Sequence, residues 1–129
     1  MLFVLLATCA VAAQTSRAGR EVKFKVGQGD TLEGGNLRIR FVRVASDSRC
    51  PVDVNCVWAG NAEIVFEVGG RGWRGKRTLT LNTNPSRQQS DEGRYGRYTL
   101  KLVRLDPQPR SDRTARAGQY TATLLVVRE

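Results

Sequence analysis

Alternation of apolar and polar residues is the main pattern along this chain. In the segment 21–27, Val22, Phe24 and Val26 alternate with charged residues. Side chains of a strand point alternately to its two faces, so this segment predicts a strand with one buried face. Further strands are predicted over residues 36–45, 62–68, 73–81, 98–105 and 118–127. No segment shows a convincing helical period.

Local features add detail to these strands. The apolar phase changes sides within residues 36–45, so one extra residue near Phe41-Val42 predicts a β-bulge there. Gly60-Asn61 predicts a bulge or tight bend at the start of the following strand. Gly69-Gly70 predicts a two-residue hairpin turn.

The predicted fold is an all-β sandwich. Six or seven short strands separated by polar turns are typical of a small two-layer, immunoglobulin-like β-sandwich. A small β-barrel is the alternative. A chain of 129 residues has the usual size of one domain. Residues 21–129 are expected to form it, with long loops over residues 82–93 and 107–117.

The N-terminal segment has the features of an export signal. Residues 1–13 contain a run of apolar and small residues that is too short to span a bilayer, and Ala10-Val11-Ala12 fits a cleavage site. Residues 14–20 predict a flexible tether. Alternatively, residues 6–9 resemble the lipobox of bacterial lipoproteins, with Cys9 carrying the lipid. A buried N-terminal strand is a third interpretation. We expect a periplasmic or extracellular protein, or one lipid-anchored at the outer membrane.

Cys50 and Cys56 are expected to form a disulfide, because an even pair of cysteines in an exported domain is most simply oxidised. The closed loop is small, so the bond should stabilise the fold by about 2 kcal/mol. Zinc is disfavoured because the chain has no His and no second Cys pair. Trp58 is expected to pack over the disulfide, and Trp73 is expected to be the more exposed tryptophan.

The chain is strongly basic, with 21 Lys and Arg against 12 Asp and Glu and a net charge of +9. Nearly all the cations are arginines, which bind carboxylates and phosphates through forked donors. Genome composition is a sufficient cause for this excess. The functional alternative is an anionic partner in the cell envelope or outside the cell.

Arginines and aromatic rings form the candidate interaction surface. Two arginines alternate on one strand, where they form either an anion-binding pair or a solvated sheet face. A second group combines cations with rings, as glycan and single-stranded nucleic-acid sites do, although its simpler interpretation is a loop leading into a strand. The candidate residues are Arg38, Arg40, Trp73, Arg94, Tyr95, Arg97 and Tyr98.

The chain lacks the residues of common catalytic sites. The absence of His excludes Ser-His-Asp and Cys-His arrangements and most transition-metal sites. Asp47, Asp53, Asn55 and Glu63 could surround Ca²⁺, but Asp and Asn more often cap turns. We therefore expect no catalytic, metal-binding or cofactor-binding residues, and no cofactor.

One signature resembles a known family. Ser48-Arg-Cys-Pro and Cys56-Val-Trp-Ala-Gly lie between an arginine-alternating strand and Leu79-Thr-Leu-Asn-Thr83. This arrangement resembles a family of uncharacterised secreted or lipid-anchored bacterial proteins, over about residues 36–127. The resemblance implies a small exported β domain and no particular activity.

The leading hypothesis is an exported, non-enzymatic binding or interaction module of the bacterial envelope. Its partner would be an anionic envelope component or a protein. The alternative is a secreted protease inhibitor that presents Pro51–Asn55 within the Cys50–Cys56 loop. We expect a monomer with no nucleic-acid partner, because an export signal argues against one, and with membrane contact only through a lipid anchor.

Overall fold

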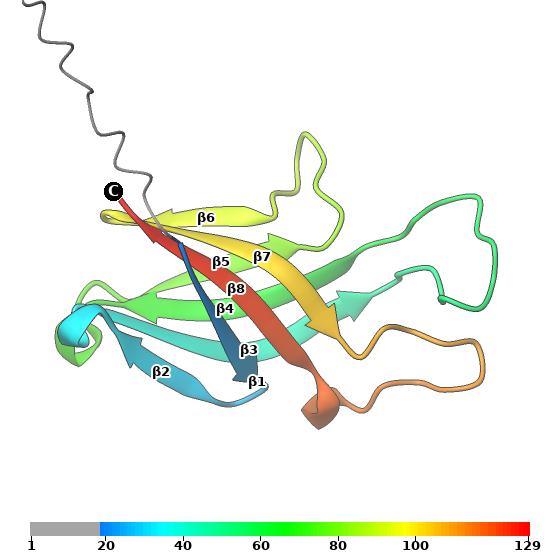
Figure 1. Cartoon of the computed structure of the whole chain (residues 1–129), viewed down its shortest axis with the longest axis horizontal. Helices are drawn as coiled ribbons and strands as arrows, with labels where there is room; N and C mark the ends of the chain where they lie inside the picture. Colours follow the sequence, from blue (N-terminus) through cyan, green and yellow to red (C-terminus); the bar gives the residue numbers. More distant parts are fainter. Residues whose placement is uncertain (1–18) are drawn as a thin grey trace, which may run out of the picture.

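The computed structural model describes residues 19–129, and these form an all-β fold of two antiparallel sheets (Figure 1). One sheet has the strand order β1-β8-β7-β6 and the other has the order β2-β3-β4-β5. The predicted two-layer sandwich is confirmed. The barrel alternative is wrong for the described residues, because no hydrogen-bonded strand pair joins the two sheets.

The strands are β1 (Arg20–Lys25), β2 (Gly29–Leu32), β3 (Leu37–Asp47), β4 (Ala62–Gly69), β5 (Arg77–Asn82), β6 (Glu92–Tyr95), β7 (Tyr98–Asp106) and β8 (Thr121–Arg128). Three short 3-10 turns connect them, η1 (Glu33–Gly35), η2 (Arg71–Trp73) and η3 (Ala117–Gln119). In this part of the chain no helix has the length and apolar character needed to cross a membrane. The predicted signal and lipidation site, Cys9, lie outside the described residues, as does most of the predicted tether.

The core lies between the sheets and is built from the alternating apolar residues. Phe41 and Phe66, on neighbouring strands of one sheet, have ring centroids 5.3 Å apart. Phe66 also meets Phe24 of the opposite sheet edge-on, at 6.5 Å. Such tilted and edge-on pairs are favoured by the ring quadrupoles and add to the burial of apolar area. The predicted inward faces of β1, β3, β4, β7 and β8 are confirmed.

The predicted bulge in β3 is also confirmed. Phe41 pairs with Phe66 and Arg43 pairs with Val65, so Val42 is the extra residue. After it, Val44 packs against the core while Arg43 stays exposed. A similar shift in β7, between Leu102 and Arg104, was not predicted.

Two strands are missing from the prediction. β2 lies in a segment expected to be a turn, and β6 lies where a loop was expected to lead into a strand. Both strands have only four residues and both are at sheet edges. Their sequences carry too few apolar residues for a period to show. They become strands because the neighbouring β3 and β7 offer backbone partners.

The predicted two-residue hairpin at Gly69-Gly70 is wrong. Gly69 ends β4, and the chain passes through η2 before β5 begins at Arg77. A tight hairpin needs positive φ at its central residues, but Gly70 has φ −85°. The positive values fall instead at Gly72, Trp73 and Gly75.

Candidate binding site

Three long connections lie at one end of the sandwich (Figure 1). They are residues 48–61 between β3 and β4, 83–91 between β5 and β6, and 107–120 between β7 and β8. The first of these, which we call the disulfide loop, lies between the other two. Hydrogen bonds tie it to both neighbours, so this end of the molecule is a single braced surface.

The base of the disulfide loop is closed by short backbone contacts. The Ser48 amide donates to the Asn61 carbonyl at 2.7 Å, and the Cys50 amide donates to the Ala59 carbonyl at 3.0 Å. Gly60 has φ +69°, and a Cβ there would lie 1.8 Å from the Ser48 carbonyl oxygen. Only glycine fits this position, so the bend predicted at Gly60-Asn61 is confirmed and is a condition for closing the loop.

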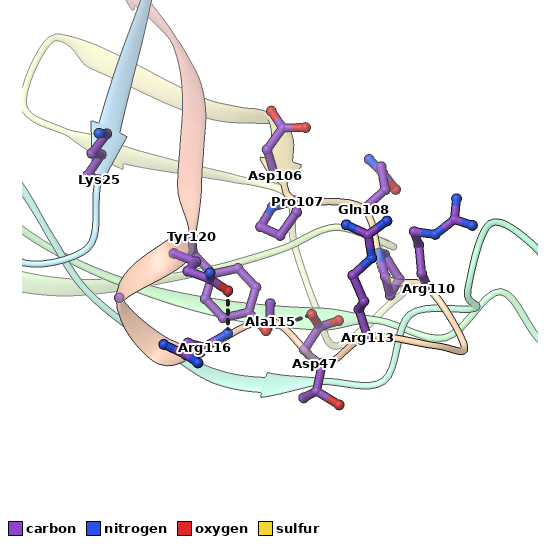
Figure 2. Close-up of a pocket in the computed structure, with 14 residues that line it drawn as sticks. Lys25, Asp47, Asp106, Pro107, Gln108, Arg110, Arg113, Ala115, Arg116 and Tyr120 are labelled. Carbon is purple, nitrogen blue, oxygen red and sulfur yellow. Dashed lines mark hydrogen bonds between the residues drawn. The ribbon is translucent and has the colours of Figure 1, made fainter.

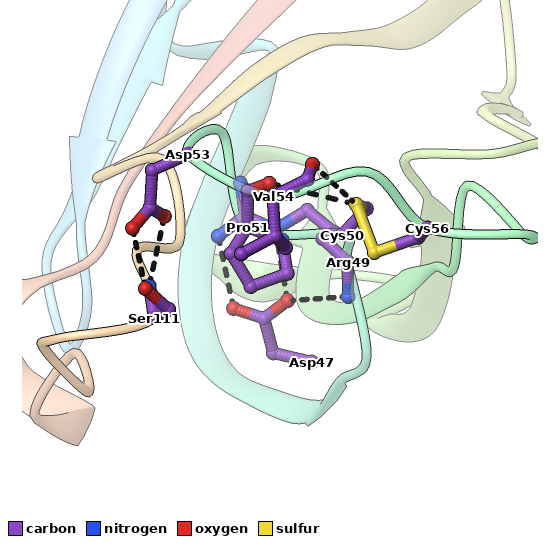
Figure 3. The surroundings of a disulfide bond; sticks show 8 residues. All are labelled: Asp47, Arg49, Cys50, Pro51, Asp53, Val54, Cys56 and Ser111. Atoms are coloured by element: carbon purple, nitrogen blue, oxygen red, sulfur yellow. Dashed lines mark hydrogen bonds and ion pairs between the residues drawn. A yellow bond between two sulfur atoms is a disulfide. The ribbon is translucent and has the colours of Figure 1, made fainter.

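The disulfide joins Cys50 to Cys56, as predicted (Figure 3). The Cα atoms are 5.9 Å apart, which is within the ordinary range for such bonds. The bond lies inside the loop and connects no two strands. It therefore restricts the shape of the loop, and the two sheets are held together by the core.

Arg49 fastens the disulfide loop to the β7–β8 connection. Its guanidinium donates to the Leu105 carbonyl at 2.7 Å and to the Pro107 carbonyl at 2.9 Å. It also forms a forked ion pair with Asp47, with N–O distances of 2.8 and 2.9 Å. Only 9% of the Arg49 side chain and 15% of the Asp47 side chain is exposed. A forked pair of this kind is directional as well as strong.

Asp47 has a second partner residue, Tyr120, whose hydroxyl donates to the carboxylate at 2.9 Å. Partial burial alone would raise the pKa of Asp47, but the hydrogen bonds from Arg49 and Tyr120 and the charge of Arg49 outweigh it, so the pKa lies below its ordinary value. Burial raises the pKa of Tyr120, and its hydrogen bond to the Asp47 carboxylate adds to this effect. Asp47 is therefore an ionised anchor whose acceptors are already occupied.

Further contacts tie the tip of the disulfide loop to the same connection. The Val52 amide donates to the Pro109 carbonyl at 2.9 Å. Asp53 accepts from the Ser111 amide at 2.9 Å and from the Ser111 hydroxyl (Figure 3). These hydrogen bonds from Ser111 lower the pKa of Asp53, so its carboxylate is ionised at neutral pH.

The β5–β6 connection braces the other side of the loop. The Asn61 side chain donates to the Asn82 side chain at 2.9 Å and accepts from the Asn84 amide at 3.0 Å. The Asn84 side chain in turn donates to the Gly60 carbonyl at 3.0 Å. Amide side chains suit this position because each both donates and accepts.

This braced loop presents apolar side chains to solvent. Val57 is 91% exposed and Trp58 is 81% exposed, while Val52 and Val54 are 58% and 42% exposed. The prediction that Trp58 covers the disulfide is therefore wrong. It assumed strand alternation after Cys56, but β4 begins only at Ala62, so side-chain direction here is set by the bends of the loop.

A groove lies beside the disulfide loop, between the β7–β8 connection, the end of β1 and Asp47 (Figure 2). Its volume is ≈ 1120 Å³. Cationic side chains line it, namely Lys25, Arg110, Arg113 and Arg116. The sequence showed the 107–117 segment as an arginine-rich loop, but only the folded chain brings Lys25 to the same groove.

The predicted interaction residues lie away from this end and make contacts within the chain. The Arg38 guanidinium lies 5.8 Å from the centroid of the Trp73 ring. Trp73 is half-buried against Gly69, where a Cβ would come within 2.9 Å of the indole. The expectation that Trp73 is the more exposed tryptophan is therefore wrong. Arg40, two residues along β3, remains exposed.

The second predicted group, Arg94, Tyr95, Arg97 and Tyr98, lies along the β6–β7 hairpin, and its side chains have different surroundings. Tyr98 is only 8% exposed and belongs to the core, so including it in a surface was wrong. The Tyr95 hydroxyl donates to the Arg74 carbonyl at 2.7 Å, and its ring lies 5.4 Å from the Arg77 guanidinium. Arg94 is paired with Glu129. In this group Arg97 and Arg94 are the exposed cations.

The acidic residues considered for Ca²⁺ are not gathered around one point. Asp47 is bonded to Arg49 and Tyr120, whereas Asp53 is bonded to Ser111. Within residues 19–129, no three His, Cys, Asp or Glu side chains form a group that could hold a metal ion.

Comparisons with known proteins give no further guide to this site. Neither protein-family models, nor curated proteins, nor solved structures gave a match. The resemblance around Arg49-Cys50-Pro51 and Cys56-Val-Trp-Ala-Gly therefore stays a prediction. The strand topology alone assigns the fold, and the geometry of the disulfide loop alone identifies the candidate site.

Proposed function

We propose that this chain is an exported, non-enzymatic binding module of the bacterial envelope that contacts a protein partner with its disulfide loop. The observation that carries the proposal is the exposure of Val57 and Trp58, at 91% and 81%, on a braced loop. Tryptophan is among the residues that most often dominate the binding energy of interfaces. Exposed apolar groups collected in one place typically mark interaction sites.

The bracing of the loop supports this role in energetic terms. A loop that is flexible before binding loses conformational entropy on binding, and this reduces the affinity. Here the disulfide, the Arg49 clamp and the Asp53–Ser111 contact already hold the loop in one shape. Trp58 can therefore be buried by a partner with little further ordering of the backbone.

Several features support a role in binding and not in catalysis. The chain has no His, and the partly buried carboxylate of Asp47 is occupied by Arg49 and Tyr120. A general base needs a free acceptor within reach of a substrate proton. The disulfide supports export, because such bonds persist in oxidising compartments.

The inhibitor alternative has less support from the geometry. Inhibition of this kind would present Pro51–Asn55 as an extended segment to a protease cleft. Val52 and Asp53 form a turn instead, and the Val52 amide is bonded to Pro109. Slow-cleavage assays against a protease panel test this alternative, and inhibition that depends on residues 51–55 would support it over the binding module.

The proposal is tested by capture from envelope extract with the immobilised disulfide-bonded domain. Val57→Ser combined with Trp58→Ser should abolish the capture of any specific partner. Since both side chains are exposed, the variant should unfold at an unchanged urea concentration. Arg97→Ser is the control, because it removes an exposed side chain at the β6–β7 turn, at the other end of the molecule. Equal capture by the wild type and the double variant would refute the proposal.

A further inference from the structure

The groove beside the disulfide loop has a marked excess of uncompensated positive charge. Asp47 is occupied by Arg49 and Tyr120, and Asp106 is paired with Arg104 at 2.8 Å. Arg110 is paired with Asp112. Among the residues that the structure describes, Lys25, Arg113 and Arg116 have no carboxylate within ion-pair distance. We propose that this groove is a second binding site, for an anionic oligosaccharide that carries carboxylate groups.

The backbone that carries these cations is held in place. The Arg113 amide donates to the Arg110 carbonyl at 3.2 Å. The Arg116 amide donates to the Gln119 side chain at 2.9 Å, and the Gln119 amide returns a bond to the Arg116 carbonyl at 2.9 Å. The connection is also fixed to the disulfide loop through Ser111 and Asp53. The cations are therefore presented from a defined backbone, which favours binding of a ligand with a matching charge pattern.

The dimensions of the groove favour a chain molecule over a single ion. Sites for small ligands measure about 300–1,000 Å³, and this groove measures ≈ 1120 Å³. Its cations are spread along it, with Lys25 on one side and Arg110 and Arg113 on the other (Figure 2). A ligand that spans the groove must carry more than one negative group. Guanidinium forks match carboxylates in geometry as well as charge.

The remaining lining distinguishes between classes of polyanion. Gln108 and Thr114 line the same groove and add neutral hydrogen-bonding groups, as hydroxyl-rich sugars require. A flat bilayer cannot enter a concave site. An acidic peptide would gain most by pairing with a free strand edge, but β1 reaches the groove only through its last residue, Lys25. The combination of cations with neutral polar groups therefore favours the oligosaccharide.

Calorimetric titration of the full domain with tetragalacturonate tests the proposal. We expect binding that weakens with added salt, and no binding of the neutral maltotetraose. Arg113→Glu combined with Arg116→Glu should lower the affinity for tetragalacturonate at least about tenfold, because charge-assisted hydrogen bonds are lost. Arg74→Glu combined with Arg97→Glu changes the net charge equally at exposed positions remote from the groove, and it should lower the affinity less than about threefold.

Three results would overturn the proposal. The first is no binding of tetragalacturonate, and the second is an equal loss of affinity in both double variants, which would indicate net charge alone. The third is tighter, groove-dependent binding of tetraglutamate, which would assign the site to an acidic peptide. The Val57→Ser, Trp58→Ser variant should retain full affinity for tetragalacturonate, so failure at the groove and failure at the disulfide loop are separable.

Discussion

At the scale of single residues, the Asp47–Arg49–Tyr120 cluster connects parts of the chain that are remote in sequence. Asp47 ends β3, Arg49 is the second residue of the disulfide loop, and Tyr120 directly precedes β8. The ion pair has two short N–O contacts and is largely covered, so solvent screens it less than an exposed pair. We therefore expect this cluster to determine how the end of the sandwich that carries the three long connections responds to low pH.

The pH dependence of this cluster follows from the direction of the pKa shift. The pKa of Asp47 is lower in the folded chain than its ordinary value. Its contribution is therefore present above the ordinary carboxyl pKa of about 4, and it is lost as the pH falls through the folded value. Asp47→Asn should lower the free energy of unfolding by about 1–3 kcal/mol at pH 7, because charged hydrogen bonds are lost.

Urea unfolding at a series of pH values measures this effect. The difference between the wild type and Asp47→Asn should shrink on acidification below about pH 4. Asp112→Asn is the control, since Asp112 is exposed and paired only with the exposed Arg110, and it should change the stability by less than about 1 kcal/mol. A difference between wild type and Asp47→Asn that does not vary with pH would contradict the ionised role of Asp47.

At the scale of elements, the disulfide loop is stabilised by three kinds of contact that act on different parts of it. Backbone bonds close its base between Ser48 and Asn61, and Arg49 and Asp53 tie it to the β7–β8 connection. The disulfide restricts only the segment between Cys50 and Cys56. Loss of the disulfide should therefore loosen the loop and leave the two sheets intact.

Cys50→Ser combined with Cys56→Ser tests this division. A small closed loop predicts a loss of about 2 kcal/mol in the free energy of unfolding. Limited proteolysis should become faster within residues 51–58 and stay unchanged in the β5–β6 connection, residues 83–91, which serves as an internal control. Loss of all cooperative unfolding in this variant would show that the disulfide supports the whole sandwich.

The strands differ in how well their own residues predict them. β3 and β4 alternate over many residues, so both their existence and their buried faces are predictable from the sequence. The register change in β3 is predictable as well, because the apolar phase itself shifts near Val42. β2 and β6 contain four residues each, and their backbone partners, not their side chains, make them strands.

At the scale of the whole molecule, the aromatic cluster joins the two layers. Phe66 is 1% exposed and lies between Phe41 of its own sheet and Phe24 of the other. The three long connections have no comparable core of their own, so their ordered conformation depends on the stability of the sandwich to which they are attached. Substitutions in the cluster should therefore affect the entire fold cooperatively.

Phe66→Ala should lower the free energy of unfolding by about 3–5 kcal/mol, because apolar contacts are lost and a cavity remains. Val103→Ala, at a bulge position that is 48% exposed, should change it by less than about 0.5 kcal/mol. Chemical denaturation followed by circular dichroism measures both. Similar losses in the two variants would contradict the assignment of Phe66 to the inter-sheet core.

Some features of this protein are determined by the sequence alone. The longer strands β1, β3, β4, β7 and β8 with their buried faces, the β3 bulge and the Cys50–Cys56 pairing follow from local patterns, because side-chain alternation and short cysteine spacing act over neighbouring residues. The bend at Gly60-Asn61 is also predictable from the local sequence. The requirement for glycine at position 60 depends on the fold, because the Ser48 carbonyl oxygen lies where a Cβ would be.

Only the tertiary structure decided where the candidate sites lie. The outward direction of Trp58, the Arg49 clamp on Leu105 and Pro107, and the meeting of Lys25 with the arginines of the β7–β8 connection all depend on segments remote in sequence. Loop side chains follow no fixed period, so their direction depends on the neighbours that the folded sheets bring beside them.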